Sequence, residues 1–159
     1  MTLISTSNIE TAKKLIKKSK SPIIVEAKDN TFNRKILEYG KFDILLSPEI
    51  GGKRDKIKQL DSGLNNITAK IAVKNKIKIG INMKEITKLK KKEKAIKIAR
   101  IKQNIDICKK AKTKIILLNI KDKKDALNFL TSLGASTQQA KQAVQSIAFY
   151  SKFHTLNES

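Results

Sequence analysis

Ser21–Ser47 reads SPIIVEAKDNTFNRKILEYGKFDILLS, and this stretch decides the fold. It holds two short apolar runs, Pro22–Glu26 and Asp43–Ser47, separated by a segment with helical spacing that begins near Asn30 and stops at Gly40. Their central residues, Ile23–Val25 and Ile44–Leu46, are continuously apolar instead of alternating with polar residues. This pattern is typical of strands covered on both faces in a parallel sheet. The stretch therefore predicts a strand–helix–strand unit.

The same alternation continues outward in both directions, which predicts five strands in one α/β domain spanning residues 1–159. The further strands are expected at Thr2–Ser5, Ile77–Ile81 and Ile115–Asn119. The further helices are expected after a capping box at Ser7–Glu10, from Asp61 or Ser62, over Glu93–Lys112, from the cap Asp122 to Leu133, and from the capping box at Ser136 to about Ile147. A full eight-unit barrel needs ~250 residues, so the candidates are a reduced barrel and an open doubly wound sheet. The last residues, Thr155–Ser159, are expected to fray.

The longest predicted helix carries most of the lysines outside its apolar side. Its predicted seam consists of Ala95, Ile98, Ile101, Ile105, Cys108 and Ala111. Lys94, Lys97, Arg100 and Lys102 fall largely outside this seam.

The chain is strongly basic, with 35 Lys and Arg against 14 Asp and Glu and a formal net charge of +21. More than half of this excess lies in Lys84–Lys124, where 16 cations face four acids. Such a charge favours a polyanionic partner, and nucleic acid is the commonest one in a cell. Because all but Arg34, Arg54 and Arg100 of these cations are lysines, recognition of the phosphate backbone is favoured over reading of base edges. The alternative is a general bias of a Lys- and Ile-rich proteome.

Several other classes of protein have little support. The chain has one histidine, His154, and one cysteine, Cys108, which disfavours an imidazole metal site, a Ser–His or Cys–His nucleophile and an internal disulfide. Cys108 is expected in the core, and the lone cysteine fits a reducing cytoplasm. No apolar stretch approaches the ~20 residues of a membrane span, so no membrane partner is expected. Five acids at predicted element ends are conceivable Mg²⁺ ligands, without the clustering of a two-metal nuclease: Glu26, Asp29, Asp43, Glu49 and Asp61.

Two loops are candidate phosphate contacts. Gly51-Gly52-Lys53-Arg54 follows a strand at its carboxyl end, where α/β proteins place functional loops, although it lacks the spacing of a P-loop. Asp61–Asn65 opens a helix whose free N–H groups could receive an anion, and an ordinary N-cap explains it equally well. None of the seven Phe and Tyr residues is interleaved with the Lys-rich stretch, so stacking platforms for single strands are not expected.

The order DILLSPE (Asp43–Glu49), DSGLN (Asp61–Asn65), AKIA (Ala69–Ala72) and IGI (Ile79–Ile81) resembles ribonuclease P protein component 3, the thirty-kilodalton subunit family of archaea and eukaryotes. The resemblance implies a TIM-like (β/α) barrel related to polymerase-and-histidinol-phosphatase domains without their metal ligands. Because family chains are usually longer at the amino end, it also implies a barrel shortened or incomplete at the N-terminus.

The resemblance further implies a non-catalytic subunit of the ribonucleoprotein that removes the 5′ leader of precursor tRNA. Its implied partners are the ribonuclease P RNA, protein component 2, other protein subunits and precursor tRNA. No cofactor is expected on this chain, and Mg²⁺ would serve the RNA-catalysed reaction. The candidate RNA-binding residues are Lys53, Arg54, Ser62, Asn65, Lys70, Lys94, Arg100 and Lys102. The alternatives are a general structured-RNA-binding protein of ribosomal or chaperone type and, with less support, a metal-dependent phosphoesterase.

Overall fold

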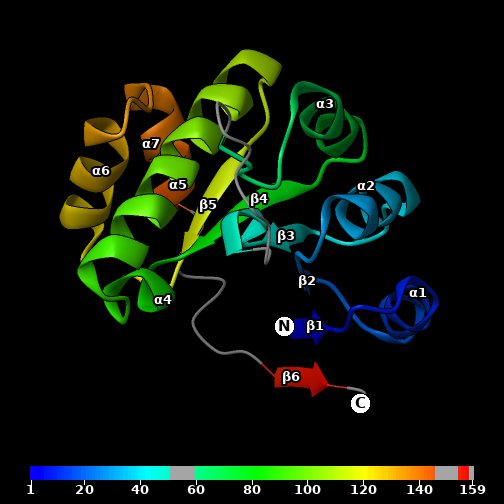
Figure 1. Ribbon diagram of the computed structural model, residues 1–159. Helices are drawn as coiled ribbons and strands as arrows, with labels where there is room; N and C mark the ends of the chain where they lie inside the picture. Colours follow the sequence, from blue (N-terminus) through cyan, green and yellow to red (C-terminus); the bar gives the residue numbers. More distant parts are fainter. Residues whose placement is uncertain (51–59, 146–153, 158–159) are drawn as a thin grey trace.

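The computed structural model describes residues 1–50 and 60–145, and the backbone of 154–157. Within them, one sheet of six parallel strands has the order β5-β4-β3-β2-β1-β6 (Figure 1). The strands are β1 (Thr2–Ser5), β2 (Ile23–Glu26), β3 (Ile44–Leu46), β4 (Lys78–Asn82), β5 (Ile115–Leu118) and β6 (His154–Asn157). All five predicted strands are confirmed, with bounds that shift by about one residue.

Helices connect the strands in chain order. They are α1 (Ile9–Lys18), α2 (Asn30–Tyr39), the 3-10 turn η1 (Pro48–Ile50), α3 (Asn66–Lys74), α4 (Met83–Thr87), α5 (Lys91–Ala111), α6 (Lys123–Ser132) and α7 (Thr137–Gln145). The sequence predicted all of these except η1 and α4, which are each a single turn or little more. Short turns carry too few residues for a 3.6-residue period to be visible.

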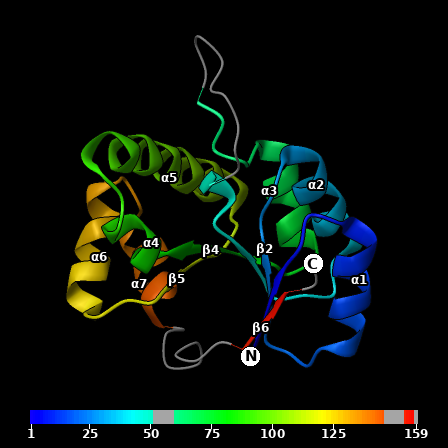
Figure 2. The ribbon, with the colours of Figure 1, turned by 60° about the horizontal axis from the view of Figure 1, so that its bottom comes forward.

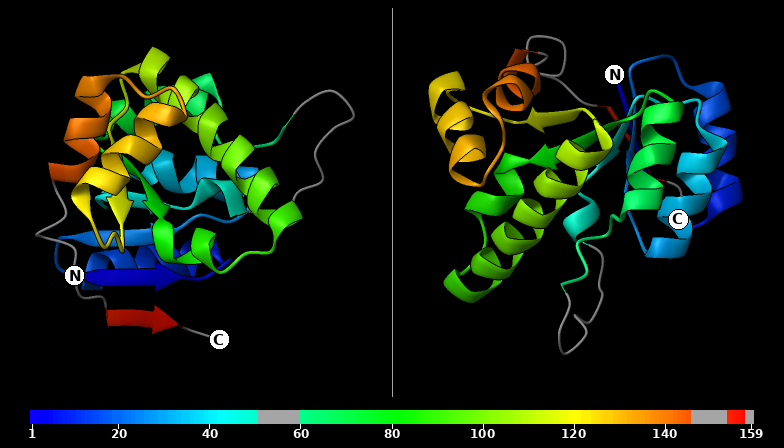
Figure 3. Two further views of the ribbon diagram at one scale, coloured as in Figure 1. Left: turned by 90° about the vertical axis from the view of Figure 1, so that its left-hand side faces the viewer. Right: turned by 90° about the horizontal axis from the view of Figure 1, so that it is seen from above.

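The sheet is curved, and the helices lie around its convex side (Figures 2 and 3). Alternate strand residues such as Val25, Leu45 and Ile79 pack with the helices in the main core. The residues between them form a second cluster that contains no helical side chain among the described residues: Ile24, Ile44, Leu46, Ile116 and Leu118, with Met1 and Leu3 packed against them. Curvature brings these concave-side residues together, so they are buried against one another.

Gly80 of β4 belongs to this concave side. A Cβ at Gly80 would lie 2.7 Å from Ile44 Cγ2 and 3.1 Å from Leu46 Cδ1. The neighbouring strand therefore occupies the space that a side chain would need, and the sheet can bend inward at this position.

Three expectations from the sequence are wrong. The doubly wound alternative fails because β1 to β5 lie side by side in chain order with helices on one face of the described sheet, whereas a doubly wound sheet carries helices on both. The fraying expected for Thr155–Ser159 fails for Thr155–Asn157, which pair with β1 as part of β6. The capping box at Ser7–Glu10 is displaced, since the Asn8 side chain caps α1 by accepting from the N–H groups of Glu10 and Thr11.

The predicted seam of α5 is correct in its second half. Ile101, Ile105 and Cys108 are buried, as expected, whereas Ala95 is exposed. The first turns of α5 pack against the short helix α4 and extend past the edge of the sheet (Figure 3). The predicted seam assumes that the whole helix lies on the sheet, so it does not apply to the first turns of α5.

Candidate nucleic-acid interface

The segment Asp61–Asn65 leads into α3 and contacts α5, and these two helices carry four of the eight predicted RNA-binding residues. Gly63 donates its N–H to Asp61 Oδ1 at 3.1 Å, and the Ser62 carbonyl accepts from Asn104 Nδ2 of α5 at 3.0 Å. Ser62 is 1% exposed, and its hydroxyl donates to the Leu64 carbonyl at 3.5 Å. Ser62 thus fixes the turn to α5 from the interior and offers no group at the surface.

Asn65, and not Asp61 or Ser62, caps helix α3. Its Oδ1 accepts from Thr68 N at 2.9 Å, and Asn65 N donates to Thr68 Oγ1 at 3.0 Å. This reciprocal pair is a capping box with threonine in the place usually taken by glutamate. The helix start is displaced from the predicted one because Gly63 lies in the left-handed region at φ 81°, where a helix cannot begin. Asn65 is exposed, and its amide side chain is engaged in the cap.

Four of the six predicted cations lie on α3 and α5, which pack against each other. Lys70 of α3 and Lys102 of α5 are exposed, and Lys94 is half-buried. Arg100 is half-buried, and its Nη1 donates to the Glu49 carbonyl in η1 at 3.2 Å. Lys53 and Arg54 lie outside the described residues. The fold therefore assembles α3, α5 and η1 into one unit, in which Arg100 has a structural contact and Lys70 and Lys102 face solvent.

Lys97 was grouped by sequence with the solvent-facing cations, and the structure buries it to 7% exposure. Its ammonium lies 3.3 Å from Glu85 Oε2 of α4, and Glu85 Oε1 accepts from Asn82 Nδ2 at 3.0 Å. The pairing could have been found only by knowing that α4 exists and packs on α5. A buried ammonium requires such a partner because desolvation of an unpaired charge is costly.

Glu49 is the most unusual ionisable group in this region. Its side chain is 2% exposed, and neither carboxyl oxygen has a hydrogen-bond partner among the described residues. Burial raises the pKa of the Glu49 carboxyl from 4.5 to about 7, although the Lys97 ammonium opposes the shift; Glu85 adds to it. Glu49 is therefore protonated in the folded protein at mildly acidic pH.

This burial predicts a loss of stability as the pH rises. A raised folded pKa means that the contribution of Glu49 is complete below its unfolded value of 4.5 and is lost as the pH passes through about 7. Glu49→Gln keeps the shape of the side chain but cannot ionise. We expect the unfolding free energy of this variant to rise relative to that of the wild type by ~3 kcal/mol as the pH increases from about 4.5 to 8. Urea denaturation of both proteins across this range measures the difference. A difference that does not change with pH contradicts the prediction.

Four of the five acids considered as Mg²⁺ ligands have other partners, and the fifth, Glu49, is buried. Asp29 accepts from Phe32 N at 2.7 Å as the cap of α2, Asp43 accepts from Ile23 N at 2.6 Å, and Asp61 accepts from Asn30 Nδ2 at 3.0 Å. Glu26 lies 2.7 Å from Lys28 Nζ and accepts from the Ser5 hydroxyl. Burial alone would raise the pKa of the Glu26 carboxyl, but these two hydrogen bonds outweigh burial, so the pKa is lowered. Across 1–50 and 60–145, three or more His, Cys, Asp or Glu side chains never gather in a way that could hold a metal ion.

Cys108 lies in the core, as the seam predicted. It is fully buried, and burial raises the pKa of its thiol to about 12. The thiol therefore stays protonated and packs as a small apolar group. Among the described residues, every helix is too short or too polar to cross a bilayer.

Comparison with known proteins gives one consistent family. No family model matches the chain. A curated protein of Methanococcus maripaludis strain C6, named ribonuclease P protein component 3, is 28% identical over 117 residues, which are 72% of this chain and 47% of that protein. A protein of the same name from Methanococcus vannielii is 26% identical over 140 residues, which are 82% of this chain and 58% of that protein. The chain thus spans about half the length of these relatives.

A solved structure shares the fold. It is described as the cryo-EM structure of archaeal ribonuclease P with mature tRNA; one of its chains matches with a TM-score of 0.77 and 23% identity, covering 92% of this chain and 64% of that one. The predicted resemblance to ribonuclease P protein component 3 is confirmed by these curated relatives.

Proposed function

We propose that this chain, as a relative of ribonuclease P protein component 3, is a protein subunit of ribonuclease P and acts in removing the 5′ leader of precursor tRNA. The observation that carries the proposal is the similarity to curated proteins of that name at 26–28% identity. Its net charge of +21 supports a partner rich in phosphates. We place it in the cytoplasm, with ribonuclease P RNA, protein component 2, other subunits and precursor tRNA as partners.

The chain is proposed to be non-catalytic. The acids at the strand and helix ends are engaged in caps and backbone contacts, as with Asp29 and Asp43, or buried, as with Glu49. A phosphoesterase would need several carboxylates free to converge on metal ions. The Mg²⁺ that we expect in the reaction would accordingly serve the RNA, with no cofactor on this chain.

We further propose that the curved sheet is a sector of a TIM-like barrel. In such a barrel each strand lies beside the one before it, and the last strand returns to the first. The chain order of β1 to β5, the helices on the convex side and the pairing of β6 with β1 support this arrangement.

Reconstitution tests the function. Ribonuclease P RNA and the remaining subunits of the source organism, combined with this chain, are expected to cleave precursor tRNA faster than the same mixture without it. The chain alone, supplied with Mg²⁺ or Mn²⁺, is expected to cleave nothing. Cleavage by the isolated chain would support the phosphoesterase alternative, and equal binding to unrelated structured RNAs with no effect on cleavage would support the general RNA-binding one.

Lys70→Ser combined with Lys102→Ser tests the RNA contacts proposed for α3 and α5. Both side chains are exposed, so their loss should leave the fold intact. We expect roughly tenfold weaker binding to ribonuclease P RNA, because each lost charge-assisted contact to a phosphate costs about 1.5 kcal/mol or less at a solvated site. Filter binding at fixed salt measures the change.

A charge-matched control separates contact from general attraction. Lys18→Ser with Lys141→Ser removes the same charge from exposed positions on α1 and α7. If both double variants bind equally weakly, Lys70 and Lys102 make no specific contact. Arg100 is a poor choice for this test, since its removal also releases the Glu49 carbonyl.

A further inference from the structure

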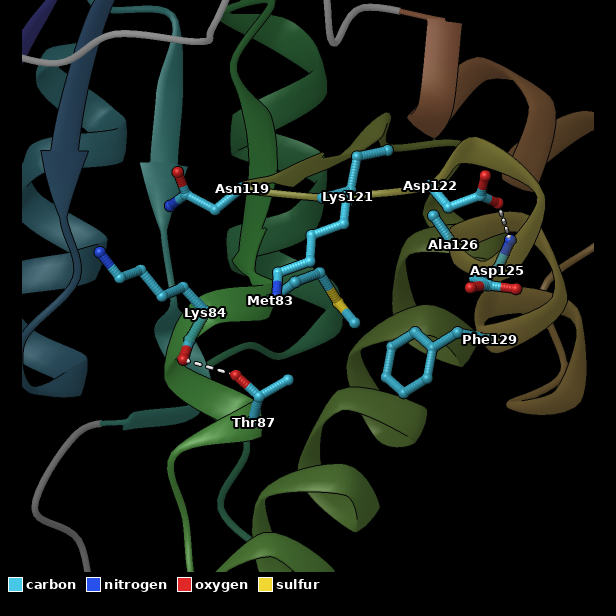
Figure 4. A pocket seen from close by; sticks show the side chains of 10 residues that line it. Met83, Lys84, Thr87, Asn119, Lys121, Asp122, Asp125, Ala126 and Phe129 are labelled. Carbon is cyan, nitrogen blue, oxygen red and sulfur yellow. Dashed lines mark hydrogen bonds between the residues drawn. The ribbon is translucent and has the colours of Figure 1, made fainter.

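A cavity of about 570 Å³ opens at the carboxyl ends of β4 and β5, between α4 and the start of α6 (Figure 4). Functional sites of parallel α/β sheets lie at this end of the strands. The volume is within the range of sites that hold a nucleotide-sized ligand. None of the predicted contacts on α3 and α5 lines it.

The interior of the cavity suits a flat ring. Its apolar lining consists of Met83, Ile120, Ala126 and Phe129. The Met83 thioether and the Phe129 ring reach into the space from α4 and α6 (Figure 4). A thioether and an aromatic face both pack favourably against a planar π-system such as a nucleobase.

The rim of the cavity suits an anion. Lys84 and Lys121 line it, both exposed and neither in an ion pair with another described residue. Lys88, Lys123 and Lys124 follow close by in the sequence and are also exposed. Two acids, Asp122 and Asp125, also line it, and Asp122 already accepts from Asp125 N at 2.9 Å. The excess of positive charge around the cavity therefore comes from the three neighbouring lysines outside the lining.

We propose that this cavity takes the base of one unpaired nucleotide of the partner RNA, with the adjoining phosphate held by Lys84 and Lys121. The partner's identity as RNA rests on the proposed function. Stacking of a base on Phe129 would overturn the expectation that the chain has no stacking platform for single strands. An apolar side chain of a partner protein would fill the interior but would make no use of the two ammonium groups beside it.

Titration with mononucleotides followed by NMR tests the site without any ribonuclease P component. Adenosine and uridine 5′-monophosphates are expected to shift the signals of Met83, Ala126 and Phe129 in the full chain. A single-stranded hexanucleotide should bind at least tenfold more tightly, since its further phosphates can reach the neighbouring lysines. Equal affinity of mononucleotide and hexanucleotide would indicate a small-molecule site and overturn the proposal.

Two pairs of variants provide the controls. Thr87→Trp fills the cavity from an exposed lining position and should abolish the shifts, whereas Asn128→Trp, exposed on α6 and outside the lining, should not. Lys84→Ser with Lys121→Ser should weaken nucleotide binding at least tenfold, whereas Lys123→Ser with Lys124→Ser removes the same charge and should change it less than threefold. Binding unaffected by Thr87→Trp, equal losses in both lysine pairs, or equal affinity for the nucleoside without phosphate would overturn the assignment.

The two proposals fail separately. If nucleotides bind in the cavity but reconstituted cleavage is unaffected by the chain, the site stands and the ribonuclease P function fails. If the chain supports cleavage and Thr87→Trp neither blocks nucleotide shifts nor weakens RNA binding, the function stands and the site fails.

Discussion

Gly63→Ala is expected to remove most of the stability of the fold. A Cβ at this position would lie 1.9 Å from the Pro48 carbonyl oxygen and 2.7 Å from the Pro48 carbonyl carbon. Both are backbone atoms, which cannot rotate away as a flexible side chain would. Gly63 also has φ 81°, where an alanine is strained. We expect a loss of ~4 kcal/mol or more in unfolding free energy, measured by urea denaturation.

Gly134→Ala is the matched control for this prediction. Gly134 has φ 96°, and the nearest atom to an added Cβ would be Asp106 Oδ1 at 3.8 Å, an ordinary contact. This variant therefore reports backbone strain alone, and we expect a loss of about 1–2 kcal/mol. Equal losses in the two variants would contradict the collision at Pro48. A larger loss in Gly63→Ala than in Gly134→Ala would mean that the glycine of DSGLN is required to dock this turn on η1, independently of any contact with RNA.

RNA affinity is expected to fall by ~10³ or more between 50 and 200 mM salt. Each lysine that replaces a counterion on a phosphate releases that ion, so the logarithm of the affinity falls linearly with the logarithm of the salt concentration. A chain with 32 lysines and three arginines can neutralise several phosphates at once. Binding to ribonuclease P RNA across a salt series measures the slope.

The variants proposed above refine this measurement. Each phosphate contact that is lost should reduce the magnitude of the slope by about one. Lys70→Ser with Lys102→Ser should therefore give a shallower salt dependence than Lys18→Ser with Lys141→Ser. Affinity that is flat over the range would contradict phosphate recognition and favour contacts with a protein partner.

The backbone plan of this protein could be predicted from local pattern. Continuous apolar runs such as Ile44–Leu46 are visible because a strand covered on both faces needs apolar residues at every position. The ends of α6 are equally local signals, since the Asp122 side chain caps its start and the positive-φ Gly134 follows its end. The family resemblance depends on the same segments, which pack β3, η1 and α3 together.

The chemistry of the interface could not be predicted in the same way. Serine and lysine are typical surface residues, yet the structure buries both Ser62 and Lys97. Their partners, Asn104 in one case and Glu85 in the other, lie 42 and 12 positions away. Glu49 is another example, since its raised pKa follows from burial under α5 and not from its neighbours in the sequence.

The sequence by itself determined the alternation of strands and helices, the parallel sheet and the strongly positive net charge, because periodicity and net charge are properties of the chain alone. The tertiary structure decided that the sheet curves, that His154–Asn157 pairs with β1, which lysines face solvent, and that a cavity opens between α4 and α6. Burial and cavities arise only where elements distant in the chain pack together, so no local pattern records them.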